Sequence, residues 1–204
     1  MGMPKISAVH GKREPEVKQQ AVLDAALDIF AESGVFGASM PAIAKRAKVG
    51  TGTIYRYFPS KEALVNAVYL REKLMLRQIL EAVQAHLAPK VAFDGIWKRL
   101  VDYVRRRPQG FRFLEMQDHL PYLDADSRAL EAEILTGVAG FFAGLQHEGV
   151  VRRDLRPDVL LALIWGAFVN LFKAERGGYL RLTDSDIAAA RDATWGMCLR
   201  GEQP

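Results

Sequence analysis

The sequence predicts an all-α protein of about nine helices, in which a three-helix N-terminal domain precedes a larger helical domain. Apolar residues recur at three- and four-residue spacing along most of the 204 residues, and no segment alternates as a half-buried strand would. Prolines and glycines divide this pattern into segments of helical length. Because 50% of the residues are hydrophobic and 25% are charged, the chain can build a real core, which excludes a disordered tail or a disulfide-stapled miniprotein.

Three helices are expected in the first third of the chain. Residues 1–16 lack periodicity and are predicted to form a flexible basic arm, and the first helix then runs to Gly34, which ends it in a left-handed turn. Ser39 is placed to cap a second helix that ends near Lys48. A third short helix covers residues 52–58 and turns its two apolar residues inward.

Helical patterning continues from Ser60 to the end of the chain, without an internal repeat. The expected helices cover residues 60–87, 93–107 and 111–120, a longer segment through Leu130 that closes at Gly149, residues 157–172, and a segment capped by Thr183 that ends near Gly201.

The positive charge of the chain is confined to its first third. The net charge is +4. Residues 1–61 hold nine basic and five acidic residues, and the remainder holds nineteen of each. This asymmetry is expected where a nucleic-acid-binding module is joined to a module with another task.

Composition argues against several other classes of protein. The single cysteine, Cys198, can form neither an intrachain disulfide nor a structural zinc site, and the histidines show no metal-ligand spacing, so we expect no metal and no cofactor. The apolar run over residues 159–172 is shorter than the ~20 residues that span a bilayer, and the N-terminus lacks a signal-peptide core. We therefore expect a cytoplasmic protein.

Two short helices joined by a tight turn and supported by a first helix are the parts of a helix-turn-helix. In the third helix, Gly52 would let DNA approach the backbone, and Arg56 can donate to guanine N7 and O6. The hydroxyl of Tyr55 and the ammonium of Lys61 suit phosphate oxygens. For an arbitrary helix pair, however, Tyr55 would more often be a packing residue.

Residues 34–64, GVFGASMPAIAKRAKVGTGTIYRYFPSKEAL, closely resemble the signature of the tetracycline-repressor (TetR) family, and the likeness extends over roughly residues 17–68. The resemblance implies a DNA-binding surface, with phosphate contacts from Tyr55 and Lys61 and base readout by Arg56. The positions implied are Ser39, Thr51, Gly52, Thr53, Tyr55, Arg56, Tyr57 and Lys61.

Three positions depart from the family pattern. Ala38 stands where a hydroxyl residue is common, Lys48 where the turn commonly has glycine, and Gly50 where a serine often caps the third helix. A lysine in a left-handed turn costs ~1 kcal/mol relative to glycine, which a packed motif tolerates.

Members of the family usually hold a small effector in the second domain, and the aromatic residues there are numerous enough to line a cavity. They could equally fill a solid core. The candidates for an apolar or aromatic effector site, with His119 or Asn170 as polar anchors, are Trp97, Tyr103, Phe113, Met116, His119, Phe141, Trp165 and Asn170.

The run over residues 159–172 is apolar on nearly every side, so a second copy of the chain would complete its burial; an ordinary buried helix is the alternative. A helix-turn-helix protein that reads two half-sites also favours a homodimer. The candidate interface residues are Leu161, Ile164, Phe168, Trp195, Cys198 and Leu199.

These patterns predict a helix-turn-helix domain over residues 17–63 and an effector-binding and dimerisation domain over residues 64–204. The expected function is that of a repressor that binds double-stranded DNA at a palindromic operator as a dimer and is released by an effector. An activator of the same fold is the first alternative. A protein-interaction module and a helical-bundle enzyme, with catalysis by Glu115, Asp118 or His119, are the remaining alternatives. Neither explains the charge asymmetry, and no catalytic motif accompanies these three residues.

Overall fold

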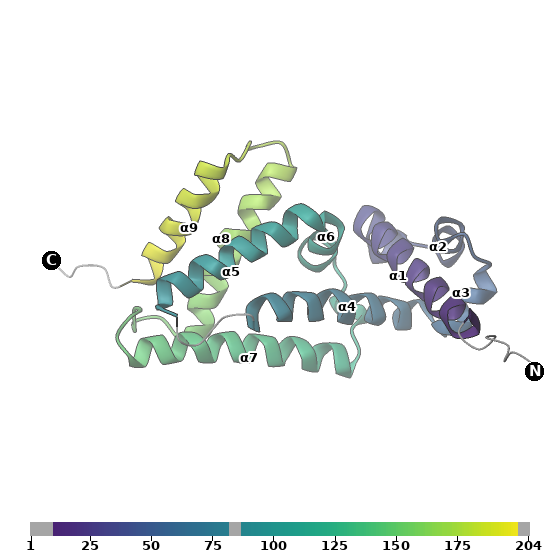
Figure 1. Ribbon diagram of the computed structural model, residues 1–204, viewed down its shortest axis with the longest axis horizontal. Coiled ribbons are helices and arrows are strands. Elements are labelled where there is room, and N and C mark those ends of the chain that lie inside the picture. The colour runs from purple at the N-terminus through teal and green to yellow at the C-terminus, as the bar shows by residue number, and fades with distance from the viewer. Residues whose placement is uncertain (1–9, 82–86, 200–204) are drawn as a thin grey trace, which may run out of the picture. The chain divides into compact units, whose positions relative to one another are not determined.

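The computed structural model describes residues 10–81 and 87–199, which form nine α-helices and one 3-10 helix without a strand (Figure 1). The all-α prediction is confirmed. The elements are α1 His10–Gly37, α2 Met40–Ala47, α3 Thr51–Tyr57, α4 Lys61–Glu81, α5 Pro89–Arg106, α6 Pro108–Met116, η1 Leu120–Tyr122, α7 Ala125–His147, α8 Pro157–Arg176 and α9 Asp184–Cys198.

Two compact units divide the described chain. The first holds the chain up to Glu72 together with Pro108–Ser127, and the second holds Lys73–Arg107 and the chain from Arg128 onward. Helices α4 and α7 each give their first residues to the first unit and the rest to the second. The domain boundaries expected from the sequence remain a prediction, because compactness alone does not show which residues bind a ligand.

The core of the first unit is built on α1. Val22, Ala26 and Phe30 recur at four-residue spacing on α1 and are completely buried. Phe30 stacks on Phe113 of α6, with the ring centroids 5.9 Å apart. Ile54 of α3 is also completely buried in this core. The apolar face that the sequence predicts for α1 therefore holds α3 and α6 in one cluster.

α1 begins earlier than the sequence predicts. Residues 10–16, which we assigned to the arm, are helical, and residues 1–9 lie outside the described residues. Lysine, arginine and glutamate are good helix formers, a preference that a search for apolar periodicity does not register. At Gly34, with φ of 72° and ψ of 164°, the helix kinks where we expected it to end, and helical structure resumes as far as Gly37.

Prolines explain most other differences in helix boundaries. Pro89 and Pro108 open α5 and α6, several residues before the expected starts, because the first helical turn does not need a proline N–H. Residues 82–86, expected at the end of α4, lie outside the described residues. At α9 the expected capping box is present, with Thr183 Oγ1 accepting from the Asp186 amide and the Asp186 carboxylate accepting from the Thr183 amide.

A buried amide fixes the start of α7 within the first unit. Nδ2 of Asn66 on α4 donates to the carbonyl oxygens of Glu62, at 2.9 Å, and Tyr122, at 2.8 Å. Oδ1 of Asn66 accepts from the Asp124 amide at 2.9 Å and from the Ser127 hydroxyl at 2.7 Å. Because an amide side chain offers two donors and two acceptor positions, all four are used here.

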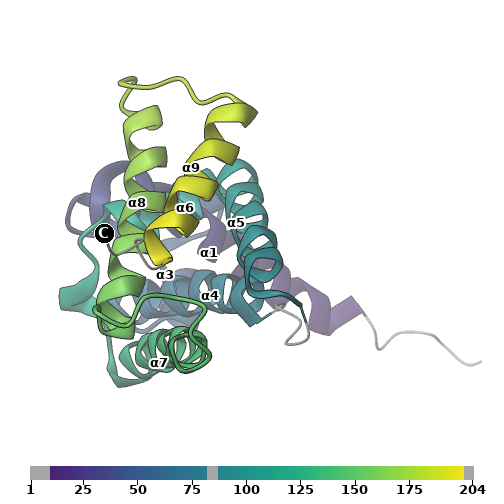
Figure 2. The same cartoon turned by 90° about the vertical axis from the view of Figure 1, so that its left-hand side faces the viewer.

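In the second unit, α8 and α9 lie side by side, joined by the loop that Figure 2 shows at the top. Aromatic rings fill the space between α5, α8 and α9. Trp97 meets Phe168 edge to face, with centroids 5.1 Å apart, and Phe93 lies 5.2 Å from Trp195. Such pairs add specific geometry to the burial of apolar area.

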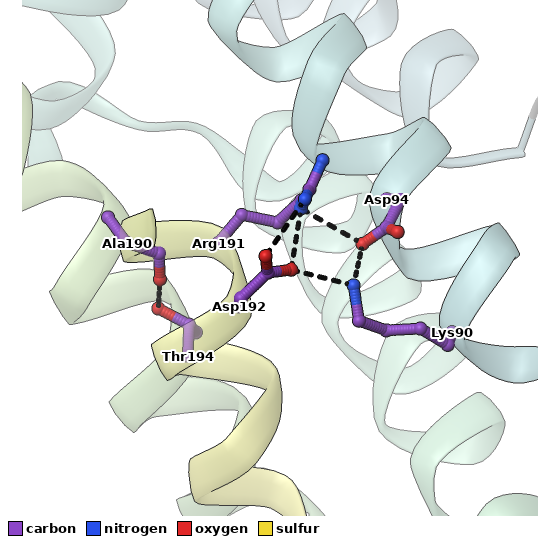
Figure 3. Close-up of polar contacts among 6 residues, drawn as sticks. All are labelled: Lys90, Asp94, Ala190, Arg191, Asp192 and Thr194. Atoms are coloured by element: carbon purple, nitrogen blue, oxygen red, sulfur yellow. Dashed lines mark hydrogen bonds and ion pairs between the residues drawn. The ribbon is translucent and has the colours of Figure 1, made fainter. Parts of the chain in front are cut away.

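Four charged side chains join α5 to α9 (Figure 3). Nζ of Lys90 lies 2.5 Å from Asp94 and 2.8 Å from Asp192, and Nε of Arg191 lies 3.2 Å from Asp94 and 3.0 Å from Asp192. Hydrogen bonds from Arg191 and then Lys90 lower the pKa of Asp192 to about 2. With two cations and two anions the cluster is neutral, and it links the two helices without adding net charge.

Candidate nucleic-acid interface and ligand cavity

The turn between α2 and α3 is closed by backbone hydrogen bonds around Lys48. The Val49 amide donates to the Ala44 carbonyl at 3.0 Å, and the Lys48 amide donates to the Lys45 carbonyl at 3.3 Å. This is the Schellman arrangement, which places one residue in the left-handed region. Lys48 has φ of 56° and ψ of 40°, as the sequence predicts for this position. The turn therefore fixes α3 relative to α2 with lysine in place of the usual glycine.

α3 presents one face to the core and another to solvent. Ile54 and Phe58 are buried, whereas Tyr55 and Arg56 are exposed. Thr51, Thr53 and Tyr57 are half-buried at the edges of the exposed face. We call α3 the reading helix, because it is the helix expected to contact DNA bases. Its residues Gly52, Tyr55 and Arg56 face solvent, as that role requires.

Within the described residues, no packing contact requires position 52 to be glycine. A Cβ atom built at this position would meet nothing within 4 Å, and its backbone is helical. Glycine inside a helix costs ~1 kcal/mol relative to alanine. The open space above Gly52 is compatible with the close approach of DNA that the sequence predicts, and that role stays a prediction.

Tyr57 holds the side chain of Arg56. Nη2 of Arg56 donates to the Tyr57 hydroxyl at 3.2 Å, and the guanidinium carbon lies 5.1 Å from the centre of the Tyr57 ring. The ring of Tyr57 packs against the core of the first unit. The guanidinium of Arg56 is thus partly preorganised. Tyr57, which is itself held against the core, orients its remaining N–H donors.

Lys61 and Ser39 both have structural roles beside the predicted contacts. The Lys61 ammonium donates to the carbonyl oxygens of Ala38, at 2.7 Å, and Phe36, at 3.3 Å, which ties α4 to the turn between α1 and α2. One of its three donors remains for a phosphate. Ser39 caps α2, as predicted, because its hydroxyl oxygen accepts from the Ala42 amide at 3.3 Å.

A cavity of about 700 Å³ lies within the second unit. Trp97, Phe141 and Trp165 line it, as the sequence predicts. α4 contributes Arg77, Leu80 and Glu81, and α7 contributes a face of the helix. The α7 lining is Glu133, Ile134, Gly137, Val138, Gly140, Phe141, Phe142, Gly144, Leu145 and, just beyond the helix, Glu148.

Five of the predicted cavity residues do not line it. Phe113, Met116 and His119 belong to the first unit, where His119 is buried with its ring 5.3 Å from that of Phe113. The chain turns at Pro108, and α6 packs on α1 in the core of the first unit. Apolar periodicity does not indicate such a long-range contact. Tyr103 is buried elsewhere in the second unit, and Asn170 is exposed on α8.

The expected dimer interface also needs correction. Trp195 and Cys198 are buried within the protomer, and Ile164 and Phe168 are buried beside the cavity, so none of the four is available to a second copy. Leu161 also lines the cavity, whereas Leu199 is exposed, so its place at an interface stays a prediction. A helix that is apolar on all sides can turn one face to the protomer core and another to a second copy of the chain. The sequence does not indicate which face meets which neighbour. Small and apolar residues are exposed elsewhere on α8 and α9, namely Ala162, Leu163, Ala167, Ser185, Ala189, Ala193 and Gly196.

α8 is long and apolar enough to cross a membrane by length and composition alone, and 22% of its most apolar window is buried in the described part of the chain. Core helices of soluble proteins have the same properties. Here Leu160, Ile164, Phe168 and Phe172 place one complete face of α8 in the core of the second unit.

The sequence interpretation missed the charged and glycine residues of the cavity. Their signal is the spacing of positions 133, 137, 140, 144 and 148, which repeats on one face of a helix. Of the acid–base candidates, Asp118 is exposed and His119 is enclosed by aromatic rings. Within residues 10–81 and 87–199, no cluster of three or more histidine, cysteine, aspartate or glutamate side chains could hold a metal ion.

Known proteins resemble this chain along almost its whole length. Residues 22–68 match the bacterial regulatory proteins of the tetR family, and residues 72–198 match the tetracyclin repressor-like C-terminal domain. The HTH-type transcriptional regulator RutR of Escherichia coli K12 is 31% identical over 203 residues, which cover 94% of this chain and 86% of RutR. The HTH-type transcriptional regulator UidR of the same strain is 42% identical over 60 residues, 29% of this chain and 31% of UidR.

Solved structures agree with these matches. A TetR-family protein from Vibrio parahaemolyticus has a TM-score of 0.72 and 28% identity, covering 90% of this chain and all of that one. A TetR-family regulator from Marinobacter aquaeolei VT8, at 20% identity, shares the fold with a TM-score of 0.80 over 92% of this chain and 98% of its own. The chain therefore belongs to the TetR family of transcriptional regulators, and it is a DNA-binding helix-turn-helix protein rather than an enzyme.

Proposed function

We propose that this protein is a cytoplasmic repressor that binds a palindromic operator as a homodimer and leaves it when a small apolar or aromatic effector occupies the second unit. The observation that carries this proposal is the coexistence of an exposed reading helix in one unit and a cavity of about 700 Å³ in the other. A cavity of that size is in the range that holds small-molecule ligands.

Arg56 is the residue proposed to read bases, with Gly52 allowing close approach and Tyr55 contacting phosphate. Thr51, Thr53, Tyr57, Lys61 and Ser39 complete the proposed surface. Arg56→Ala should cost ~1–3 kcal/mol of binding free energy on the cognate operator and much less on random DNA. Arg106→Ala removes an equal charge from the exposed last turn of α5 and serves as the control. Equal losses on both DNAs for Arg56→Ala would remove its role in base readout.

The dimer is proposed to form through the exposed small and apolar residues of α8 and α9. Small side chains allow helices to approach closely. Two half-sites require two copies of the helix-turn-helix domain, which we call the reading head. Leu163→Glu should convert the dimer to a monomer in sedimentation velocity. Leu74→Glu is a matched control, since Leu74 on α4 and Leu163 are both 45% exposed. A dimer that survives Leu163→Glu would place the interface elsewhere.

Effector and DNA are proposed to be linked through α4. This single helix starts at Lys61, whose ammonium holds the α1–α2 turn, and ends among residues that line the cavity. If the effector favours a conformation with wrongly spaced reading heads, it lowers the affinity for DNA, and DNA lowers the affinity for the effector by the same factor. Half-sites about one helical turn apart, ~34–36 Å, suit such a dimer.

Selection from random duplexes at two salt concentrations, followed by sequencing, tests the DNA half of this proposal. An enriched palindrome is expected, and weak binding without enrichment would contradict it. Activation instead of repression is the alternative, and a reporter gene placed under the selected operator distinguishes the two by the sign of its response.

A further inference from the structure

The cavity wall carries an excess of negative charge. Its charged residues in the described chain are Arg77, Glu81, Glu133 and Glu148, which give a formal charge of −2 at neutral pH. Arg77 is already paired, with Nε 2.6 Å from Glu81 and Nη2 2.9 Å from Glu133. An anionic ligand would therefore have to break an existing pair and would still face the other carboxylates.

Glu148, at the solvent-exposed rim of the cavity, is the carboxylate that is open to a ligand. It follows α7 directly, with its amide donating to the Gly144 carbonyl at 3.0 Å, and in the described chain it has no ion-pair partner. The nearby Arg153 uses its guanidinium on the carbonyl oxygens of Gln146 and His147. A ligand cation could pair with Glu148 without displacing another side chain.

Aromatic rings dominate the rest of the wall. The aromatic side chains that line the cavity are Phe93, Trp97, Phe141, Phe142, Trp165 and Phe168. Aromatic faces attract organic cations through their quadrupole, most strongly for tryptophan. Trp97, the stronger kind of ring for this interaction, is 4% exposed and is one of these lining side chains.

Three glycines of α7 leave space in the cavity for a ligand. Gly137, Gly140 and Gly144 lie on the α7 face that lines the cavity, and a Cβ atom at each would meet nothing within 4 Å. In the part of the chain that the structure describes, no contact requires these residues to be glycine, although each weakens the helix. The cavity wall is therefore set back along α7, in the stretch between Glu133, which pairs with Arg77, and Glu148.

We propose that the effector is a lipophilic organic cation, with an aromatic or apolar body and with Glu148 as its counter-ion. This inference rests on the proposed effector site and names the class of ligand. A neutral ligand of the same shape would fill the volume without forming a charge pair with Glu148, and an anion would be repelled by it.

Three probes that share a 6-methoxynaphthalene body test the charge. They carry at position 2 a trimethylammoniomethyl group, its uncharged carbon isostere neopentyl, or an acetate. Isothermal titration calorimetry of the full chain, in one buffer and cosolvent, should give the cation at least about tenfold tighter binding than the neutral isostere, with the anion weakest. This is a stringent order, because the neutral probe is the most hydrophobic of the three.

Variants assign the preference to Glu148. Glu148→Gln should remove most of the preference for the cation, and Glu148→Lys should move it toward the acetate. Glu16→Gln, an equal charge change on exposed α1, should leave it unchanged. Thermal melts verify that each variant is folded.

The outcomes separate this inference from the proposed function. A neutral probe that binds as tightly as the cation, or a preference that survives Glu148→Gln, overturns the cationic class while leaving an apolar effector in place. If none of the three probes binds, the effector site fails and the inference fails with it, whereas operator binding is judged by the selection experiment alone.

Discussion

Replacing Asn66 by alanine is expected to lower the free energy of unfolding by about 3–4 kcal/mol. The substitution removes the hydrogen-bond partners of the Tyr122 carbonyl, the Asp124 amide and the Ser127 hydroxyl. The Glu62 carbonyl retains its place in the α4 ladder. Asn66 is 5% exposed and Ser127 is completely buried, so water replaces the lost bonds poorly. An unsatisfied buried group costs ~1–3 kcal/mol, and three groups near the lower limit give the expected total.

Urea unfolding followed by circular dichroism, at one protein concentration, measures this loss. Ser127→Ala removes one bond and should cost ~1 kcal/mol, and the double variant should cost less than the sum because the two residues share that bond. Gln78→Ala, at an exposed amide on the same helix, is the control. A loss below ~1 kcal/mol for Asn66→Ala, with an unchanged slope in urea, would refute the claim that this amide fixes the start of α7.

Three further changes test other parts of the structure. Gly140→Ala should stabilise α7 by up to ~1 kcal/mol in urea unfolding while weakening binding of the cationic naphthalene probe, because the new methyl group occupies cavity space. Asp192 has a folded pKa of about 2 against an ordinary value of 3.8, so its stabilising contribution is complete above pH 4 and is lost as the pH falls toward 2. Asp192→Asn should therefore flatten the fall in melting temperature over that range, and Asp102→Asn should not. Burial raises the pKa of the Cys198 thiol to about 11, so iodoacetamide at pH 8 should alkylate it slowly in the folded protein and rapidly in urea, and fast labelling of the folded chain would contradict its burial.

Local signals predicted the reading head well. The cap at Ser39, the left-handed Lys48 and the inward Ile54 each depend on residues within one or two helical turns, and the structure has all three. The same holds for the capping box at Thr183. What the sequence did not indicate is the second use of Lys61, because its carbonyl partners lie more than twenty positions earlier in the chain.

Long-range placement explains the errors in the second domain. Phe113 and Trp165 are both large aromatic residues on apolar helices, yet one packs on α1 and the other lines the cavity. Periodicity identifies a buried face but not the element that buries it. Likewise, Trp195 and Cys198 form an apolar stripe that suits a protomer core as well as an interface between subunits. Glycines and carboxylates also line the cavity, and a search for aromatic residues does not detect them.

The discontinuous first unit limits how its reading head can be exchanged between regulators. The head is completed by α6, which returns to α1 only after α5 and brings Phe113 onto Phe30. A chimaera joined at Glu72 to the ligand-binding part of another protein would leave that side of α1 uncovered unless the donor supplied an equivalent of α6. Transplants of this head should therefore carry Pro108–Ser127 with it, and the number of working hybrids should depend on that graft more than on the choice of junction within α4.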